Sequence, residues 1–131
     1  MKYMLIFVGE EGGWEDRSPE EMKAAMERWW SYERELVDAG AHISGEGLQD
    51  SATATTIRIS DDGERIVSDG PFAETKEQVG GFYLIDVSDL DEALEWAKKV
   101  PMQGGAIEIR PVMDYAQFGV DRPEQAAEAT S

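Results

Sequence analysis

Short apolar runs separated by turn residues divide the sequence into segments with the patterns of β-strands. Residues 3–8 and 81–87 are almost continuously apolar, which is typical of central, buried strands. Residues 53–60 alternate Thr, Ile and Arg with the period of a half-exposed strand. The Asp61-Asp62-Gly63 turn then returns the chain, so residues 53–68 predict a β-hairpin. The strands predicted in this way cover residues 3–8, 41–48, 53–60, 64–68, 81–87 and 106–112.

The first helix is predicted to begin after Ser18. Ser18 is a good N-cap, Pro19 suits the first helical position, and Glu21 completes an S-x-x-E capping box. Gly40 ends the helix, since glycine readily adopts the left-handed conformation that follows a helix C-terminus. The helical spacing predicts a buried stripe of Met22, Ala25, Met26, Trp29, Leu36 and Val37, with Trp30 and Tyr32 off its centre.

A second helix is predicted over residues 89–99. Either Ser88 or Asp89 can cap it, and Pro101 stops it. The basic pair Lys98-Lys99 suits the C-terminal end of a helix, where positive charge is favoured. The predicted apolar face consists of Leu90, Ala93, Leu94 and Ala97.

The order of these elements predicts one α+β domain. A β-α-β-β-α-β chain folds most simply into an antiparallel sheet with both helices on one face, the ferredoxin-like arrangement. The hairpin over residues 53–68 is then an insertion, expected to extend one edge of the sheet. Because the other face of such a sheet is bare, we expect a second copy to cover it and the chain to be a homodimer. The domain is expected over residues 1–115, followed by an acidic, flexible tail over residues 116–131.

Composition narrows the classes of partner. The chain has 131 residues, with 12 Lys and Arg against 28 Asp and Glu, for a formal net charge of −16. Such a charge repels phosphate backbones and anionic membrane surfaces, and it disfavours anionic ligands unless a local basic cluster overrides it. The absence of cysteine excludes disulfides, thiolate metal sites and cysteine nucleophiles. Without a segment that looks like a signal peptide or a membrane span, a cytoplasmic location is expected.

Residues 69–86, DGPFAETKEQVGGFYLID, combine a forced turn, a polar loop and an apolar strand. Gly70 can adopt backbone angles that other residues avoid, and Pro71 fixes φ and removes an amide donor. Together they stop the preceding strand near Asp69 and hold its carboxylate in a defined place. This loop is therefore the first candidate for a binding site.

This run and three others carry a resemblance to a known family. They are DGPFAETKEQVGGFYLIDV (residues 69–87), GEGLQDSATATTIRI (45–59), DLDEALEWAKKVP (89–101) and IEIRPV (107–112). Over most of residues 1–112 the chain resembles the YCII-related proteins of the DGPF subgroup. The resemblance implies a dimeric ferredoxin-like α+β fold, an α/β-barrel-like assembly in which the two sheets face each other.

The resemblance implies less about chemistry. In the smaller YCII-type relatives, a His on the first helix lies with an Asp in a cleft that is suspected to be catalytic. The first helix here contains no histidine, so only Asp69 matches that pair. Members of the DGPF subgroup often occur beside sigma factors of the extracytoplasmic-function type, so the resemblance implies a regulatory partner.

Asp69, Glu74 and Lys76 form the better polar cluster. Asp69 can act as a general base if a partly buried cleft raises its pKa, and Lys76 can anchor a negative group. The structural alternative is that Asp69 caps the Gly70-Pro71 turn, while Glu74 and Lys76 are a solvated pair that contributes little energy.

The lone histidine, His42, is the weaker catalytic candidate. Imidazole suits proton transfer near neutral pH, but a His at the start of a strand is more often half-exposed or hydrogen-bonded. No spacing of His and carboxylates resembles a metal motif, and no phosphate loop or dinucleotide fingerprint is present. Neither a metal nor a cofactor is therefore expected.

Aromatic residues can supply an apolar wall. Phe72, Trp29, Tyr83 and Tyr3 can line a pocket between the first helix, the Asp69 loop and the sheet, although core packing explains each equally well. Trp14, in a polar loop, either covers the core or packs on a partner. Two functions follow: a small-molecule-binding dimer, with or without cofactor-independent acid–base chemistry, or a non-enzymatic protein whose acidic surface docks a basic partner such as a sigma factor.

Overall fold

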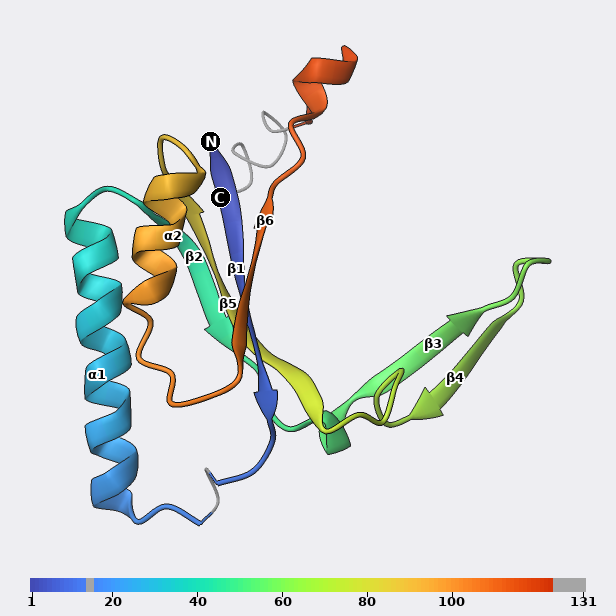
Figure 1. Ribbon diagram of the computed structural model, residues 1–131. Coiled ribbons are helices and arrows are strands. Elements are labelled where there is room, and N and C mark those ends of the chain that lie inside the picture. Colours follow the sequence, from blue (N-terminus) through green and yellow to red (C-terminus); the bar gives the residue numbers. More distant parts are fainter. Residues whose placement is uncertain (14–15, 124–131) are drawn as a thin grey trace.

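The computed structural model describes residues 1–13 and 16–123. Over these residues the chain forms a four-stranded sheet with two helices on one face, and a two-stranded sheet that projects from this body (Figure 1). The main sheet consists of β1 (Lys2–Glu10), β2 (His42–Gly47), β5 (Glu77–Asp86) and β6 (Ala106–Pro111). The other elements are α1 (Pro19–Asp38), α2 (Leu90–Lys98), β3 (Thr55–Ile59), β4 (Arg65–Asp69) and the short 3-10 helices η1 (Ser51–Thr53) and η2 (Tyr115–Phe118).

The strands of the main sheet lie in the order β2-β5-β1-β6, with every pair of neighbours antiparallel. In the register of the central strand, Leu5 lies opposite Tyr83 of β5 and opposite Ile109 of β6. Because β1 and β2 are not neighbours, α1 crosses over the sheet between them, and α2 does the same between β5 and β6. The predicted antiparallel sheet with both helices on one face is confirmed, and the arrangement is compatible with a ferredoxin-like α+β fold.

The core fills the space between the sheet and the helices. Leu5, Leu36 and Ile85 are fully buried, and each such side chain contributes about 1.5–3 kcal/mol to stability relative to an exposed one. Tyr32 is also buried, and its hydroxyl donates a 2.8 Å hydrogen bond to the carbonyl oxygen of Trp96. This bond joins α1 to α2 and satisfies the polar end of a buried ring.

The predicted helix boundaries are confirmed by capping bonds. The backbone N–H of Glu21 donates to Oγ of Ser18, and Gly40 has the left-handed φ of +73° that follows a helix end. At α2 the cap is Asp89, whose side chain accepts from the N–H of Glu92. These signals are local, so the sequence carries them in full.

The predicted helix faces were wrong at several positions. Tyr32 lies at the centre of the buried stripe of α1, whereas Val37 is 54% exposed. The contact line of α1 runs through residues 25, 29, 32 and 36, and Val37 is one position beyond it. On α2, Leu90 and Leu94 are exposed, because this helix presents Ala93 and Ala97 to the sheet.

The hairpin of β3 and β4 does not extend an edge of the main sheet, contrary to the prediction. The two strands pair only with each other in the described part of the chain and form a separate two-stranded sheet. Figure 1 shows this hairpin pointing away from the helices. We call the two strands and their turn, residues 55–69, the arm.

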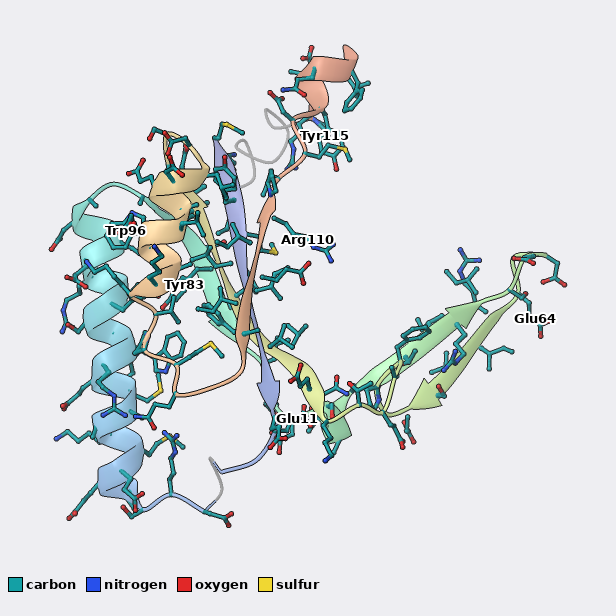
Figure 2. The ribbon with its side chains drawn as sticks, viewed as in Figure 1. Glu11, Glu64, Tyr83, Trp96, Arg110 and Tyr115 are labelled. Carbon is teal, nitrogen blue, oxygen red and sulfur yellow. The ribbon has the colours of Figure 1, made fainter. Side chains whose placement is uncertain are left out.

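The face of the main sheet opposite the helices is open and largely apolar. Residues that alternate with the buried ones along β1 and β5 lie on it, and Arg110 of β6 points away from the helices there (Figure 2). Arg110 donates a 2.6 Å hydrogen bond to the carboxylate of Glu108 on the same strand. The apolar residues of this open face are Met4, Ile6, Val8, Phe82 and Leu84.

No helix among the described residues is long and apolar enough to cross a membrane.

Candidate functional site

A cleft of about 530 Å³ opens at the end of the main sheet where β1 ends and β5 begins. The middle of α1 supplies one wall through Ala25, Arg28 and Trp29. The strand ends supply another, and loops 48–50 and 101–105 complete the lining. The cleft is therefore assembled from five segments that are distant in sequence, and its volume falls within the range of small-molecule sites.

Trp29 is the apolar part of this lining. Its half-buried ring lies 5.3 Å, centroid to centroid, from the ring of Phe7, which also lines the cleft. A tilted contact between two aromatic rings fixes the orientation of both. Trp29 can therefore offer a rigid surface to a planar ligand.

Arg28 lies one residue before Trp29 and is exposed at the same cleft. Among the described residues its guanidinium makes no hydrogen bond, ion pair or ring contact. Arg17, just before α1, lines the cleft as well. A guanidinium carries five N–H donors in a planar fork that matches a carboxylate, so the helical side of the cleft can bind an anionic group.

The sheet side of the cleft is acidic. Glu10 and Glu77 lie directly opposite each other across β1 and β5, an arrangement that disfavours strand pairing because the two charges are alike. Glu11 (Figure 2) is held by Ser51, whose N–H and hydroxyl donate to the carboxylate at 2.7 and 2.6 Å. These bonds fix the loop of η1 against the end of β1. The cleft thus has a basic side on α1 and an acidic side on the sheet.

Glycines bring the backbone close together at the base of the cleft. Gly105 has φ +86°, and a Cβ at this position would lie 3.2 Å from Cα of Gly9. Only glycine allows loop 101–105 to approach β1 so closely. The loop that closes this side of the cleft therefore depends on residue 105 having no side chain.

The Asp69 loop lies elsewhere. Asp69 ends β4 opposite Thr55, is exposed, and does not line the cleft. Gly70 has φ +101° and its N–H donates to the carbonyl of Ala54 at 2.8 Å, so the expected forced turn is present. The Gly70-Pro71 turn thus closes the base of the arm.

Phe72 is 71% exposed, and the guanidinium of Arg58 lies 4.9 Å from its ring centroid. It does not share the cleft with Trp29, so the predicted apolar wall of these two residues is not formed within one chain. Glu74 and Lys76 are exposed and form no ion pair with each other in the described part of the chain. Of the residues predicted to bind a ligand, Trp29 alone lines the cleft.

Tyr83 and His42 form a second polar cluster, on the core side of the sheet. The hydroxyl of Tyr83 donates to Oε1 of Glu33 at 3.1 Å, and Figure 2 shows this tyrosine between the sheet and the helices. Burial, with the Glu33 charge beside it, raises the pKa of Tyr83 far above its usual range. His42 Nε2 is buried 3.6 Å from the same Glu33 oxygen and has no hydrogen bond among the described residues. This cluster joins β2 and β5 to α1 and does not line the cleft.

A larger hollow of about 1050 Å³ lies between residues 111–123 and the end of the sheet where β1 begins and β5 ends. Most of its walls come from that one segment, which includes η2.

No group of three or more His, Cys, Asp or Glu residues in the described ranges is arranged to hold a metal ion. Trp14 lies outside the described residues.

Sequence reasoning missed Arg28, the paired Glu10 and Glu77, and the glycine loop. An arginine without a partner among the described residues has no sequence signature, since that property depends on the fold. Gly104-Gly105, in contrast, is a visible signal just before the last strand, since a pair of glycines there is consistent with a close backbone approach, but no prediction was drawn from it.

Comparison with known proteins identifies relatives but no activity. The family described as YCII-related domain matches residues 1–116. A protein of Rhizobium meliloti (strain 1021), named Uncharacterized protein R00369, is 40% identical over 118 residues, which cover 88% of this chain and 94% of that protein.

Proposed function

The chain belongs to the YCII-related family, and from the geometry of its cleft we propose that it binds a small organic molecule there. The observation that carries the proposal is the adjacency, on one helix, of an arginine without a partner among the described residues and a rigid tryptophan. We assign the ligand to planar carboxylic acids: the ring lies against Trp29 and the carboxylate binds Arg28.

The electrostatics of the chain support this assignment. A net charge of −16 keeps anions away from most of the surface, so an anionic ligand requires a local cationic site. Arg28 and Arg17 provide one on the helical side of the cleft. The acidic side, with Glu10 and Glu77, favours a ligand that also carries a hydrogen-bond donor such as an amine or a hydroxyl.

Three finer assignments belong to the same proposal. The DGPF subgroup is supported by the run over residues 69–87, and the homodimer is supported by the open apolar face of the sheet. Asp69 is proposed as a general base that acts on a molecule bound near the arm. Because Asp69 does not line the cleft, its role needs a test separate from that of Arg28.

The test is a thermal-shift screen with small carboxylic acids, amines and neutral molecules. A ligand that binds only the folded state raises Tm, and the stabilisation grows with the ratio of ligand concentration to Kd. Wild type is compared with Arg28→Gln and Asp69→Asn, and Arg34→Gln is the matched control, since Arg34 is exposed on the same helix outside the cleft. We expect carboxylic acids to raise Tm of wild type, Arg34→Gln and Asp69→Asn but not of Arg28→Gln.

The other outcomes are equally informative. A stabilisation lost in Asp69→Asn and kept in Arg28→Gln moves the site to the arm. If no compound raises Tm of wild type, the ligand proposal fails. The second candidate, an acidic surface that docks a basic protein such as a sigma factor, is then tested by co-purification with such a factor.

A further inference from the structure

The arm presents apolar side chains that nothing in the described chain covers. Ile57, Ile59 and Val67 are 57%, 61% and 65% exposed. In the register of the hairpin Ile57 lies opposite Val67, so these three side chains share one face of the arm. Ile66 lies on the other face, beside Arg58.

Such a hairpin does not sustain its own structure in water. A two-stranded ribbon is at best marginally stable unless a hydrophobic face packs against another surface. Exposed β-branched residues on an unpaired ribbon also invite contact with other chains. The arm therefore requires a partner surface.

The base of the arm is nevertheless fixed in direction. The Thr56 hydroxyl donates to the carbonyl of Gly70 at 2.6 Å, and Arg58 donates to the carbonyl of Phe72 at 3.1 Å. With the bond from Gly70 to Ala54, these contacts tie β3 to the loop that follows β4. The arm leaves the body on the side away from the helices, which is also the side of the open face (Figure 1).

We propose that the arm clasps a second copy of this chain, packing the Ile57, Ile59 and Val67 face against it. This inference rests on the proposed homodimer, in which the open faces of two sheets meet. Facing sheets lie about 10 Å apart, whereas the five residues of β3, Thr55–Ile59, span about 16 Å at about 3.3 Å per residue. The arm is longer than the gap between the sheets, so it passes the edge of the partner's sheet.

The charges favour a copy of this chain as the occupant. The ten residues of β3 and β4 include two arginines and one aspartate, whereas α1 carries six acidic and three basic residues. The strands of the arm are therefore the part of the projecting surface that an acidic chain can approach with little repulsion. The acidic turn at the tip of the arm forms hydrogen bonds within itself: the Asp62 carboxylate accepts from the Ser60 hydroxyl and from the N–H of Glu64. We place the contact along the strands rather than at the tip.

The first test measures dimer dissociation by sedimentation velocity. Ile57→Thr with Val67→Thr keeps β-branched residues on the arm but removes apolar contacts from the clasping face. The matched control is Ile66→Thr, on the opposite face of the same arm. We expect the double variant to raise the dimer Kd by about tenfold or more and the control to leave it within about twofold.

The second test locates the arm. The chain has no cysteine, so Arg65→Cys, which lies opposite Ile59 on the clasping face, gives a single attachment point for a photoreactive maleimide. Unlabelled and ¹⁵N-labelled chains are mixed and then irradiated. The clasp predicts cross-linked products that contain one chain of each kind. A stable dimer that gives no mixed product and is unaffected by the double variant overturns the clasp and leaves the homodimer standing. A wild-type chain that is monomeric at all concentrations overturns both, while the thermal-shift screen decides the ligand proposal independently.

Discussion

At Gly45, on strand β2, the backbone lies against the ring of Tyr83. A Cβ built on Gly45 would lie 2.6 Å from Cε1 of Tyr83 and 2.9 Å from the carbonyl oxygen of Phe82. Gly45→Ala is expected to reduce the free energy of unfolding by about 1–3 kcal/mol, because the ring and the neighbouring strand must move. Gly80→Ala is the control, since nothing lies within 4 Å of a Cβ there. Urea unfolding measures both, and equal midpoints for the two variants would show that residue 45 tolerates a side chain.

Two buried tyrosines, Tyr32 and Tyr83, make the free energy of unfolding depend on pH in the alkaline range. Burial raises the pKa of Tyr32 and of Tyr83 far above the usual value near 10, so the folded state keeps both phenols neutral. Their stabilising contribution is complete below pH about 10. Above it the unfolded chain loses these protons first, so the free energy of unfolding falls as pH rises, by about 1.4 kcal/mol per pH unit for each tyrosine.

The comparison of wild type with Tyr83→Phe isolates one of these groups. Urea unfolding at a series of pH values from 8 to 11.5 should show a shallower alkaline decline in the variant. Absorbance at 295 nm should show one fewer phenol that ionises only on unfolding. An unchanged pH slope in Tyr83→Phe would contradict the assignment.

Single residues differ in how far the sequence discloses their roles. Trp29 was predicted to line a pocket, because a large aromatic on the buried stripe of α1 faces the sheet wherever the sheet lies. Arg28 was not predicted, since its value as an anchor depends on which carboxylates the fold brings near it. Tyr32 was placed off the buried stripe, and its position became clear only with the Trp96 carbonyl that accepts its hydrogen bond.

At the scale of elements, the loop that follows β4 controls the entry to β5. Gly70 has φ +101°, a conformation that is strained for any residue with a side chain. Pro71, the next residue, has its own φ fixed by the proline ring. Gly70→Ala or Pro71→Ala is expected to lower hydrogen-exchange protection in the arm and the first half of β5 more than in α1 and α2. An equal loss of protection in all elements would show that the loop has no special role.

Element boundaries were accessible from sequence because their causes are local. Ser18 and Glu21 lie within one turn of helix, and Gly40 acts on the residues directly before it. The direction of the arm was not accessible. The sequence shows the alternation and the turn of a hairpin, but its separation from the main sheet depends on η1 and on the Gly70 turn, which together set its path.

At the scale of the whole molecule, acidic residues dominate both helices, whereas the open face is largely apolar and one face of the arm carries Ile57, Ile59 and Val67. Exposed apolar residues also occur on the helices, at Trp30, Val37, Leu90 and Leu94. The fold class followed from the order of elements, and the bare face of the sheet followed from having both helices on one side. The cleft did not follow, because five separate segments meet to form it.

The central claim, that the cleft binds a planar carboxylate between Trp29 and Arg28, is tested most directly by NMR titration with benzoate. The account predicts that benzoate shifts the indole N–H of Trp29 and the amides of Gly104 and Gly105, which line the same cleft. These shifts should persist in Arg34→Gln and disappear in Arg28→Gln. Shifts that are absent from these groups, or that are equal in Arg28→Gln and wild type, would contradict it.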